Sequence, residues 1–182
     1  MSRKKGKATI KRILLVEDDE GIIPDLCSIL DKYKDQLEVI EAGDAGEALR
    51  TIRESTGNQR LNALVLDIML PYGTAKKELE ADDDIHELET GMRMLKWLRD
   101  QEVANKIPHL WVAVITARSK YAVQNKVENL LGSHGKLYLK PFDTIQFEDD
   151  LVKAIGIESK VDPILLPNDA EMDDQEQGEI LP

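Results

Sequence analysis

The stretch from Ile13 to Asp19 reads ILLVEDD, four aliphatic residues followed by three carboxylates. An apolar run of this kind is typical of a strand that helices cover on both faces. Three further apolar runs end in the same way on one polar residue, at Asp67, Thr116 and Lys140. Because the carboxyl ends of parallel strands share one edge of a sheet, the sequence predicts that these polar side chains converge there.

Short apolar runs alternate with amphipathic stretches through most of the chain. We expect strands at 12–17, 37–41, 62–67, 110–115 and 136–140, and helices at about 21–33, 44–55, 91–103, 118–131 and 144–155. This strict alternation predicts an α/β fold with a parallel sheet and right-handed crossovers. Asp44, Ser119 and Asp143 precede three of the helices as capping residues do, and Gly132 and Gly156 follow the last two.

The 182-residue chain has a formal net charge of −11, and two segments carry it. Residues 72–91 hold seven acids against two lysines, and residues 158–182 hold eight acids against one lysine. These segments sum to −12, so the rest of the chain is nearly neutral. It lacks the excess of Lys and Arg that nucleic-acid binding requires, so we expect no nucleic-acid partner.

The length of the chain suits one domain with its own core. We expect a disordered basic arm at 1–11, a single domain at 12–157 and a disordered acidic tail at 158–182. The single Cys27 cannot form an internal disulfide, which favours a reducing compartment. Neither a secretory signal nor a membrane span is recognisable. We therefore expect a cytoplasmic protein that does not contact membranes.

The polar residues at the strand ends suit a divalent cation and a phosphoryl group. Glu17 and Asp18 are adjacent carboxylates, which repel each other unless a cation neutralises them. Asp67 stands alone with no helix start within three residues, which favours a nucleophile or metal ligand. Thr116 and Lys140 supply a hydroxyl and an ammonium, which bind phosphate. Helix capping by the acids or by Thr116, and a plain surface position for Lys140, stay open as alternatives.

Four motifs in chain order closely resemble the receiver domain of two-component response regulators: ILLVEDD at 13–19, LDIMLP at 66–71, VITAR at 114–118 and LKPF at 139–142. The likeness covers roughly residues 12–156. It implies a flavodoxin-like (βα)5 fold, a doubly wound parallel sheet with the strand order 2-1-3-4-5.

The resemblance also implies a role for each matched residue. Asp67 is the expected phosphoacceptor, which takes a phosphoryl group from a histidine kinase or a phosphotransfer protein. Thr116 is expected to hydrogen-bond one phosphoryl oxygen and Lys140 to pair with another. The backbone N–H of Ala117 offers a further donor, and the side chain of Arg118 borders the phosphoryl group.

A magnesium ion is the cofactor that the resemblance implies. Asp18 is the expected direct ligand, and Glu17 is expected to bind through water. Asp67 and the backbone carbonyl of Met69 complete the set, and the Met69 side chain borders the phosphoryl group. Carboxylate and carbonyl oxygens are the ligands that Mg²⁺ prefers.

We therefore expect a stand-alone phosphorylation-dependent switch or phosphorelay intermediate that assists its own phosphorylation and dephosphorylation and is otherwise not an enzyme. No DNA-binding, zinc or cyclase motif is recognisable after residue 156, so output is expected through contacts with an unidentified downstream protein. One alternative is a receiver-fold interaction module that is never phosphorylated. Another is an Asp-nucleophile phosphatase of the haloacid dehalogenase type, which requires a second Asp where this chain has Met69.

The chain departs from the family pattern after the phosphoacceptor. Gly91 lies twenty residues after Pro71 instead of about four, so residues 72–90 form an acidic insertion. An apolar stripe from Ile85 to Leu95 predicts that the third helix begins near Asp84, leaving 72–83 as an exposed loop. An unstructured insertion is the alternative. A partner contact or a gating element is the function expected of a structured insertion, and an extra Mg²⁺ ligand at Glu78 or Asp82 is an alternative.

A second departure concerns the strand that ends at Lys140. Receivers carry an aromatic residue three positions before this lysine, whereas this chain has Leu137 there and Tyr138 one position later. Successive strand residues point to opposite faces, so Tyr138 is expected on the other side of the sheet. The stretch from Thr116 to Lys140 is also about two residues longer than usual, and we expect a bulge to restore the register.

Overall fold

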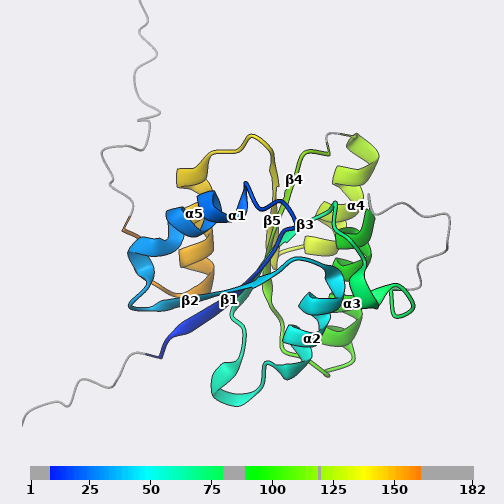
Figure 1. Cartoon of the computed structure of the whole chain (residues 1–182), viewed down its shortest axis with the longest axis horizontal. Coiled ribbons are helices and arrows are strands. Elements are labelled where there is room, and N and C mark those ends of the chain that lie inside the picture. The colour runs from blue at the N-terminus through cyan, green and yellow to red at the C-terminus, as the bar shows by residue number, and fades with distance from the viewer. Residues whose placement is uncertain (1–8, 80–88, 119, 161–182) are drawn as a thin grey trace, which may run out of the picture.

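The computed structural model describes residues 9–79, 89–118 and 120–160. Five parallel strands form one sheet in the order β2-β1-β3-β4-β5, which confirms the expected α/β fold and its strand order (Figure 1). The strands are β1 (Lys11–Val16), β2 (Leu37–Ala42), β3 (Ala63–Asp67), β4 (Trp111–Thr116) and β5 (Gly135–Leu139). The helices are α1 (Ile23–Leu30), α2 (Ala45–Glu54), α3 (Thr90–Val103), α4 (Tyr121–Leu131) and α5 (Thr144–Ile155), with three-residue 3-10 turns η1 (Asp31–Tyr33), η2 (Gly57–Gln59) and η3 (Gly73–Ala75).

Helices cover both faces of the sheet, as the apolar strands predict. Helices α2, α3 and α4 pack on one face, where alternate strand residues such as Leu14, Leu64 and Val112 are fully buried. Helices α1 and α5 pack on the other face, over Ile13 and Val65. No helix in the described ranges is both long and apolar enough to cross a bilayer.

Several predicted helix boundaries are confirmed by their caps. Asp44 accepts a hydrogen bond from the backbone of Glu47, and Asp143 accepts from Ile145 and Gln146. Gly132 and Gly156 end α4 and α5 with positive φ angles of 53° and 73°, which glycine adopts without strain.

Two helices have boundaries that differ from the prediction. The first helix begins at Ile23 instead of residue 21, because the backbone carbonyl of Asp19 already receives the N–H groups of Ile22 and Ile23 in a turn. Its last predicted residues form the 3-10 turn η1. The fourth helix begins at Tyr121 instead of residue 118, and the expected cap Ser119 lies outside the described residues.

The first part of the insertion is docked on the core, which corrects the prediction of an exposed loop at 72–83. The side chains of Tyr72, Ala75 and Leu79 are buried in the cluster beneath α2 and α3. Apolar burial of this kind favours a fixed position over a solvated loop because it removes hydrocarbon from water. Residues 80–88, which include the predicted start of the third helix near Asp84, lie outside the described residues.

Close backbone contacts and charged groups hold this docked segment against α2. Gly73 has a φ of +53°, and a Cβ there would overlap the Asp44 carboxylate. A Cβ on Gly46 would lie 2.7 Å from the Thr74 nitrogen. Arg53 of α2 pairs with Glu78 and lies over the ring of Trp97. The carboxylate of Glu78 therefore contacts α2. Helix α3 begins at Thr90, and Glu89 is its cap residue, with a φ of −132°.

The predicted bulge in the last strand is absent. Residues Gly135 to Leu139 pair in unbroken register with Val112 to Thr116, so the extra residues are absorbed before the strand. Leu137 packs toward the α3 and α4 side, and Tyr138 is buried on the α5 side, as the alternation of strand side chains predicts. Tyr138 donates a hydrogen bond to Asp150 of α5 (2.8 Å). Burial and this acceptor raise the pKa of Tyr138.

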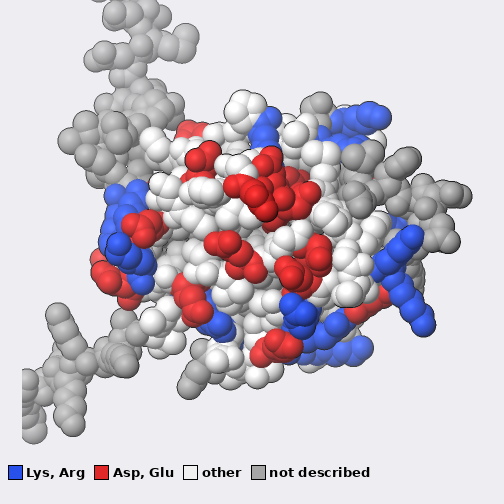
Figure 2. Space-filling view, viewed as in Figure 1, with Lys and Arg blue, Asp and Glu red and all other residues white. Residues whose placement is uncertain are grey.

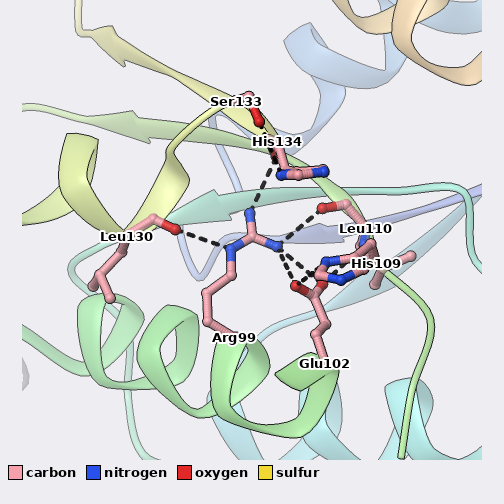
Figure 3. Close-up of polar contacts among 7 residues, drawn as sticks. All are labelled: Arg99, Glu102, His109, Leu110, Leu130, Ser133 and His134. Atoms are coloured by element: carbon pink, nitrogen blue, oxygen red, sulfur yellow. Dashed lines mark hydrogen bonds and ion pairs between the residues drawn. The ribbon is translucent and has the colours of Figure 1, made fainter. Parts of the chain in front are cut away.

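A buried ion pair closes the amino-terminal edge of the sheet (Figure 3). Nη1 of Arg99 donates to both carboxylate oxygens of Glu102, at 2.9 and 2.8 Å, and the Glu102 side chain is fully buried. Arg99 also donates to the backbone carbonyl oxygens of Leu110, Leu130 and His134. Glu102 accepts in addition from the Leu110 backbone N–H, and it lies 3.0 Å from His109 Nδ1. The pair therefore joins the ends of α3 and α4 to the starts of β4 and β5.

Replacement of Glu102 by alanine is expected to destabilise the fold by about 3 kcal/mol, because it leaves the partly buried Arg99 without its counter-charge. Urea unfolding followed by circular dichroism measures the change. Asp100→Ala is the control, because Asp100 and Lys96 form an exposed ion pair at 3.5 Å whose loss is expected to cost less than about 1 kcal/mol. Equal losses in the two variants would contradict a supporting function for the buried pair.

Candidate functional site

Strand register brings the polar strand ends to one edge of the sheet. Val16 pairs with Leu66, so the next residues along each strand, Glu17 and Asp67, leave the sheet side by side. Asp67 in turn pairs with Ile115, and Thr116 is the residue that follows. The expected convergence at the carboxyl edge is thus present for these strands.

Lys140 completes the cluster from β5. Its backbone N–H donates to the Thr116 carbonyl oxygen (2.9 Å), which continues the β4–β5 ladder one residue beyond the strand. Its Nζ donates to Asp67 Oδ2 (2.6 Å) and to Glu17 Oε2 (2.8 Å). Both carboxylate side chains are only 3% exposed, so one ammonium bridges two buried acids.

The charges of this trio shift one another's ionisation. Burial raises the pKa of Glu17, and the nearby Asp67 carboxylate adds to this effect, while the hydrogen bond from Lys140 opposes it. Burial alone would lower the pKa of Lys140, but its hydrogen bonds to Asp67 and Glu17 outweigh that effect and raise it. The lysine therefore remains charged at neutral pH.

Asp67 is fixed through both oxygens. Its Oδ2 accepts from Lys140, and its Oδ1 accepts from the backbone N–H of Met69 (2.9 Å). The side chain of Met69 is partly exposed beside it. The turn after β3 is held by α3, because the N–H of Gly91 donates to the Ile68 carbonyl oxygen (2.9 Å).

The remaining predicted residues lie around this centre. Thr116 is 1% exposed, and its hydroxyl oxygen accepts from the backbone N–H of Arg118 (3.1 Å), which leaves its own proton to donate to a ligand. Ala117 is exposed and Arg118 is partly exposed. Asp18 is exposed next to Glu17, so both acids of the predicted pair lie at this edge.

Asp19 has a local structural contact instead. Its Oδ1 accepts from the backbone N–H of Gly21 (2.8 Å) in the turn that leads into α1. Asp18, which is exposed at the same edge, has no such turn contact among the described residues and is the better candidate ligand.

The donor chemistry of this edge fits Mg²⁺. Glu17, Asp18 and Asp67 offer hard carboxylate oxygens, and three carboxyl groups beside one lysine give this edge a formal charge of −2, which a divalent cation would balance. In the present arrangement no three acidic, cysteine or histidine side chains of the described ranges are grouped closely enough to hold a metal ion. The ammonium of Lys140 instead bridges Glu17 and Asp67.

Acidic side chains dominate the surface around this edge. Figure 2 shows them gathered in the upper middle of the view, over the region where β1 and β3 end in Figure 1. A negative surface of this kind attracts cations and repels anions, so it raises the local concentration of divalent cations.

Comparison with solved structures identifies the fold. The receiver domain of a sensor histidine kinase from Pseudomonas aeruginosa PAO1, solved with a magnesium ion coordinated in its active-site cleft, aligns over 81% of this chain and 98% of its own, with a TM-score of 0.56 and 21% identity. A CheY-like response regulator receiver domain from Methanospirillum hungatei JF-1 aligns over 81% and 94%, with a TM-score of 0.54 and 21% identity.

The chain has a receiver-domain fold. The signal receiver domain of a LuxO-type repressor protein from Vibrio parahaemolyticus supports the same assignment, covering 81% of this chain and 91% of its own with a TM-score of 0.58 and 18% identity. No protein-family model matches the sequence, and no curated protein matches it. The resemblance on four short motifs is thus confirmed by the three-dimensional arrangement of the chain.

Gly91, which marks the end of the insertion in the sequence, positions the start of α3 against the end of β3. A Cβ at this position would overlap the Asp67 carbonyl oxygen and would lie 2.7 Å from the Ile68 Cα. Glycine is therefore required for α3 to approach the end of β3. The signal in the sequence is a glycine at the start of an apolar helical stripe, but the sequence does not reveal which backbone it approaches.

Gly91→Ala is expected to destabilise the fold by about 2 kcal/mol, because the added methyl group must displace the backbone that carries Asp67. Gly43→Ala is a matched control, since its Cβ would meet only the Glu47 side chain at 4.0 Å. Urea unfolding measures both variants, and an unchanged midpoint for Gly91→Ala would show that α3 does not pack against Asp67 in this way.

Asp67→Asn is expected to lower the pKa of Glu17 toward its ordinary value. The substitution removes the carboxylate whose charge disfavours ionisation of Glu17, and burial remains as the main cause of the raised pKa. In the native protein the raised pKa means that ionising Glu17 costs stability as the pH rises from its unfolded-state pKa to its higher folded-state pKa. Carbon-detected NMR titration of the side-chain carboxyl measures the shift, and a pKa that rises in the variant would contradict the assigned repulsion.

Proposed function

We propose that this protein is a phosphorylation-dependent signalling switch that accepts a phosphoryl group on Asp67. The observation that carries the proposal is the contact of one ammonium, Lys140 Nζ, with both Asp67 and Glu17 at the carboxyl edge of a receiver-type sheet. A buried carboxylate beside a fixed cation is a nucleophile with charge compensation already in place.

In the proposed reaction, an oxygen of Asp67 attacks the phosphorus of a phosphohistidine on a histidine kinase or a phosphotransfer protein. A bond between phosphorus and the Asp67 oxygen forms while the bond between phosphorus and the histidine nitrogen breaks, and the imidazole leaves with its electron pair. The hydrogen bond from the Met69 N–H to Oδ1 holds the carboxylate in one orientation, which favours attack by a single oxygen. The product is an acyl phosphate.

Lys140 and Thr116 are proposed to compensate the charge of the transferred group. Lys140 would exchange one carboxylate partner for a phosphoryl oxygen, and the free hydroxyl proton of Thr116 would donate to another. The N–H of Ala117 and the side chains of Met69 and Arg118 are proposed to border the group. A magnesium ion held by Asp18, Asp67 and the Met69 carbonyl, with Glu17 nearby, would supply further positive charge when bound.

A change at Lys140 is proposed to reach α5 through aromatic contacts. Two residues beyond it, Phe142 packs against Tyr138 and Phe147, with ring centroids 5.8 and 5.4 Å away. Phe147 is fully buried on α5. Movement of Lys140 would thereby bias the position of α5, which provides an output to an unidentified downstream protein.

Incubation with phosphoramidate or acetyl phosphate and Mg²⁺ is expected to add one phosphoryl group, detected by intact mass and removed by hydroxylamine as an acyl phosphate is. Asp67→Asn is expected to abolish the adduct, and chelation of Mg²⁺ to slow its formation. Asp100→Asn is the control, since this exposed acid of α3 pairs only with Lys96 among the described residues. Absence of an adduct with both donors at saturating Mg²⁺ would instead favour the unphosphorylated interaction module.

A further inference from the structure

A groove between α3 and α4 is the clearest unassigned surface of the described chain. It has a volume of about 340 Å³. Met92 and Leu130, which pack against the core, provide an apolar floor, and the other lining residues are Arg93, Lys96, Lys126 and Asn129. None of these residues belongs to the candidate phosphorylation site, so the groove is separate from it.

The groove is positively charged in a protein whose net charge is −11. Arg93, Lys96 and Lys126 line it, and none of the lining residues in the described part of the chain is an acid. Lys96 lies 3.5 Å from Asp100 outside the groove, and the described residues give Lys126 no ion pair. In Figure 2 basic side chains lie along the right-hand side of the view, where Figure 1 places α3 and α4. A cationic rim over an apolar floor suits an acidic chain segment that also carries aliphatic side chains.

The sequence itself contains a segment of this chemistry. Residues 161–182 hold seven acids and no lysine or arginine. They also hold two aliphatic clusters, Ile164 to Leu166 and Ile180 to Leu181. The segment therefore matches both properties of the groove, with charge opposite to the rim and apolar side chains for the floor.

The attachment point of this segment is fixed on the opposite side of the domain. The backbone N–H of Lys160 donates to the hydroxyl of Tyr33 (2.7 Å), which in turn donates to Glu148 of α5 (2.5 Å). Twenty-two residues can span about 70 Å when extended, whereas a domain of this size has a radius of gyration of about 15 Å. The segment can therefore reach the groove from Lys160.

We propose that residues 161–182 dock in the groove between α3 and α4 of the same chain. Covalent attachment gives the segment an effective concentration of roughly millimolar at the groove, so even a weak contact is populated. Docking places acidic residues beside Lys96 and Lys126 and covers Met92 and Leu130. A partner that binds this groove must therefore displace the segment. An acidic partner must also overcome repulsion from the acids of the segment.

Carbodiimide cross-linking of the full chain tests the contact, because it joins a lysine amine to a carboxylate that lies within direct contact distance. We expect amide links from Lys96 and Lys126 to acids between Asp169 and Glu179, located by peptide mapping. In a mixture of unlabelled and ¹⁵N-labelled protein these links are expected within one chain. Links between labelled and unlabelled chains would identify a second copy as the occupant, and links to acids at 80–88 would identify that segment instead. Either result, or no link from these lysines, would overturn the proposal.

A spin label provides a second measurement that does not depend on lysine chemistry. With Cys27→Ser and Asn168→Cys, a nitroxide on residue 168 is expected to broaden the NMR methyl signals of Met92 and Leu130. Lys96→Glu with Lys126→Glu is expected to reduce this broadening at least fivefold. The control pair Lys34→Glu with Lys106→Glu changes the net charge equally at exposed positions outside the groove, and is expected to leave the broadening unchanged. Equal reduction by both pairs would show a nonspecific charge effect and contradict docking in the groove.

Discussion

The carboxyl edge of the sheet is organised around the ammonium group of Lys140. Two carboxylates, Glu17 and Asp67, leave adjacent strands side by side and are almost fully buried. Without a cation between them their mutual repulsion and desolvation would favour protonation or a rearranged edge. The ammonium therefore permits a strand order that brings two acids together, and it leaves a net negative charge for a divalent cation. Any group that competes for Lys140 changes the balance of all three residues.

Contacts on either side of the sheet connect this edge to the rest of the molecule. Gly91 allows the first turn of α3 to lie against the backbone of Asp67, and Phe142 carries the chain beyond Lys140 into the aromatic cluster of α5. At the other end of the sheet, Arg99 and Glu102 join two helices to two strands through buried hydrogen bonds. The carboxyl edge is thus supported by packing on both faces and by a buried ion pair at the opposite edge, and support of this kind holds the side chains of a site in fixed positions.

The sequence predicted the parallel sheet and the convergence at Lys140 because both follow from strong, repeated patterns, whereas the strand order came from the resemblance to receiver domains. Four apolar runs with polar ends indicate parallel strands that share one edge, and capping residues such as Asp143 indicate helix starts. The docking of residues 72–79 was not predicted, because it depends on the close approach of Gly46 to Thr74 and on the pairing of Arg53 with Glu78. These contacts join segments far apart in sequence and have no local periodicity. The absent bulge in β5 shows the same limit, since a length difference does not specify where the extra residues are absorbed.

The insertion is anchored to the domain at both ends. One end is fixed by the buried Leu79 and by Glu78 on Arg53, and the other by the contact of Gly91 with Ile68. In general, a segment that joins two fixed points of a fold adds only about 0.6 kcal/mol of loop-closure cost for each doubling of its length. Residues added between Leu79 and Gly91 are therefore expected to leave the carboxyl edge of the sheet intact. This is a position along the chain where a new recognition sequence can be acquired at little cost to the domain.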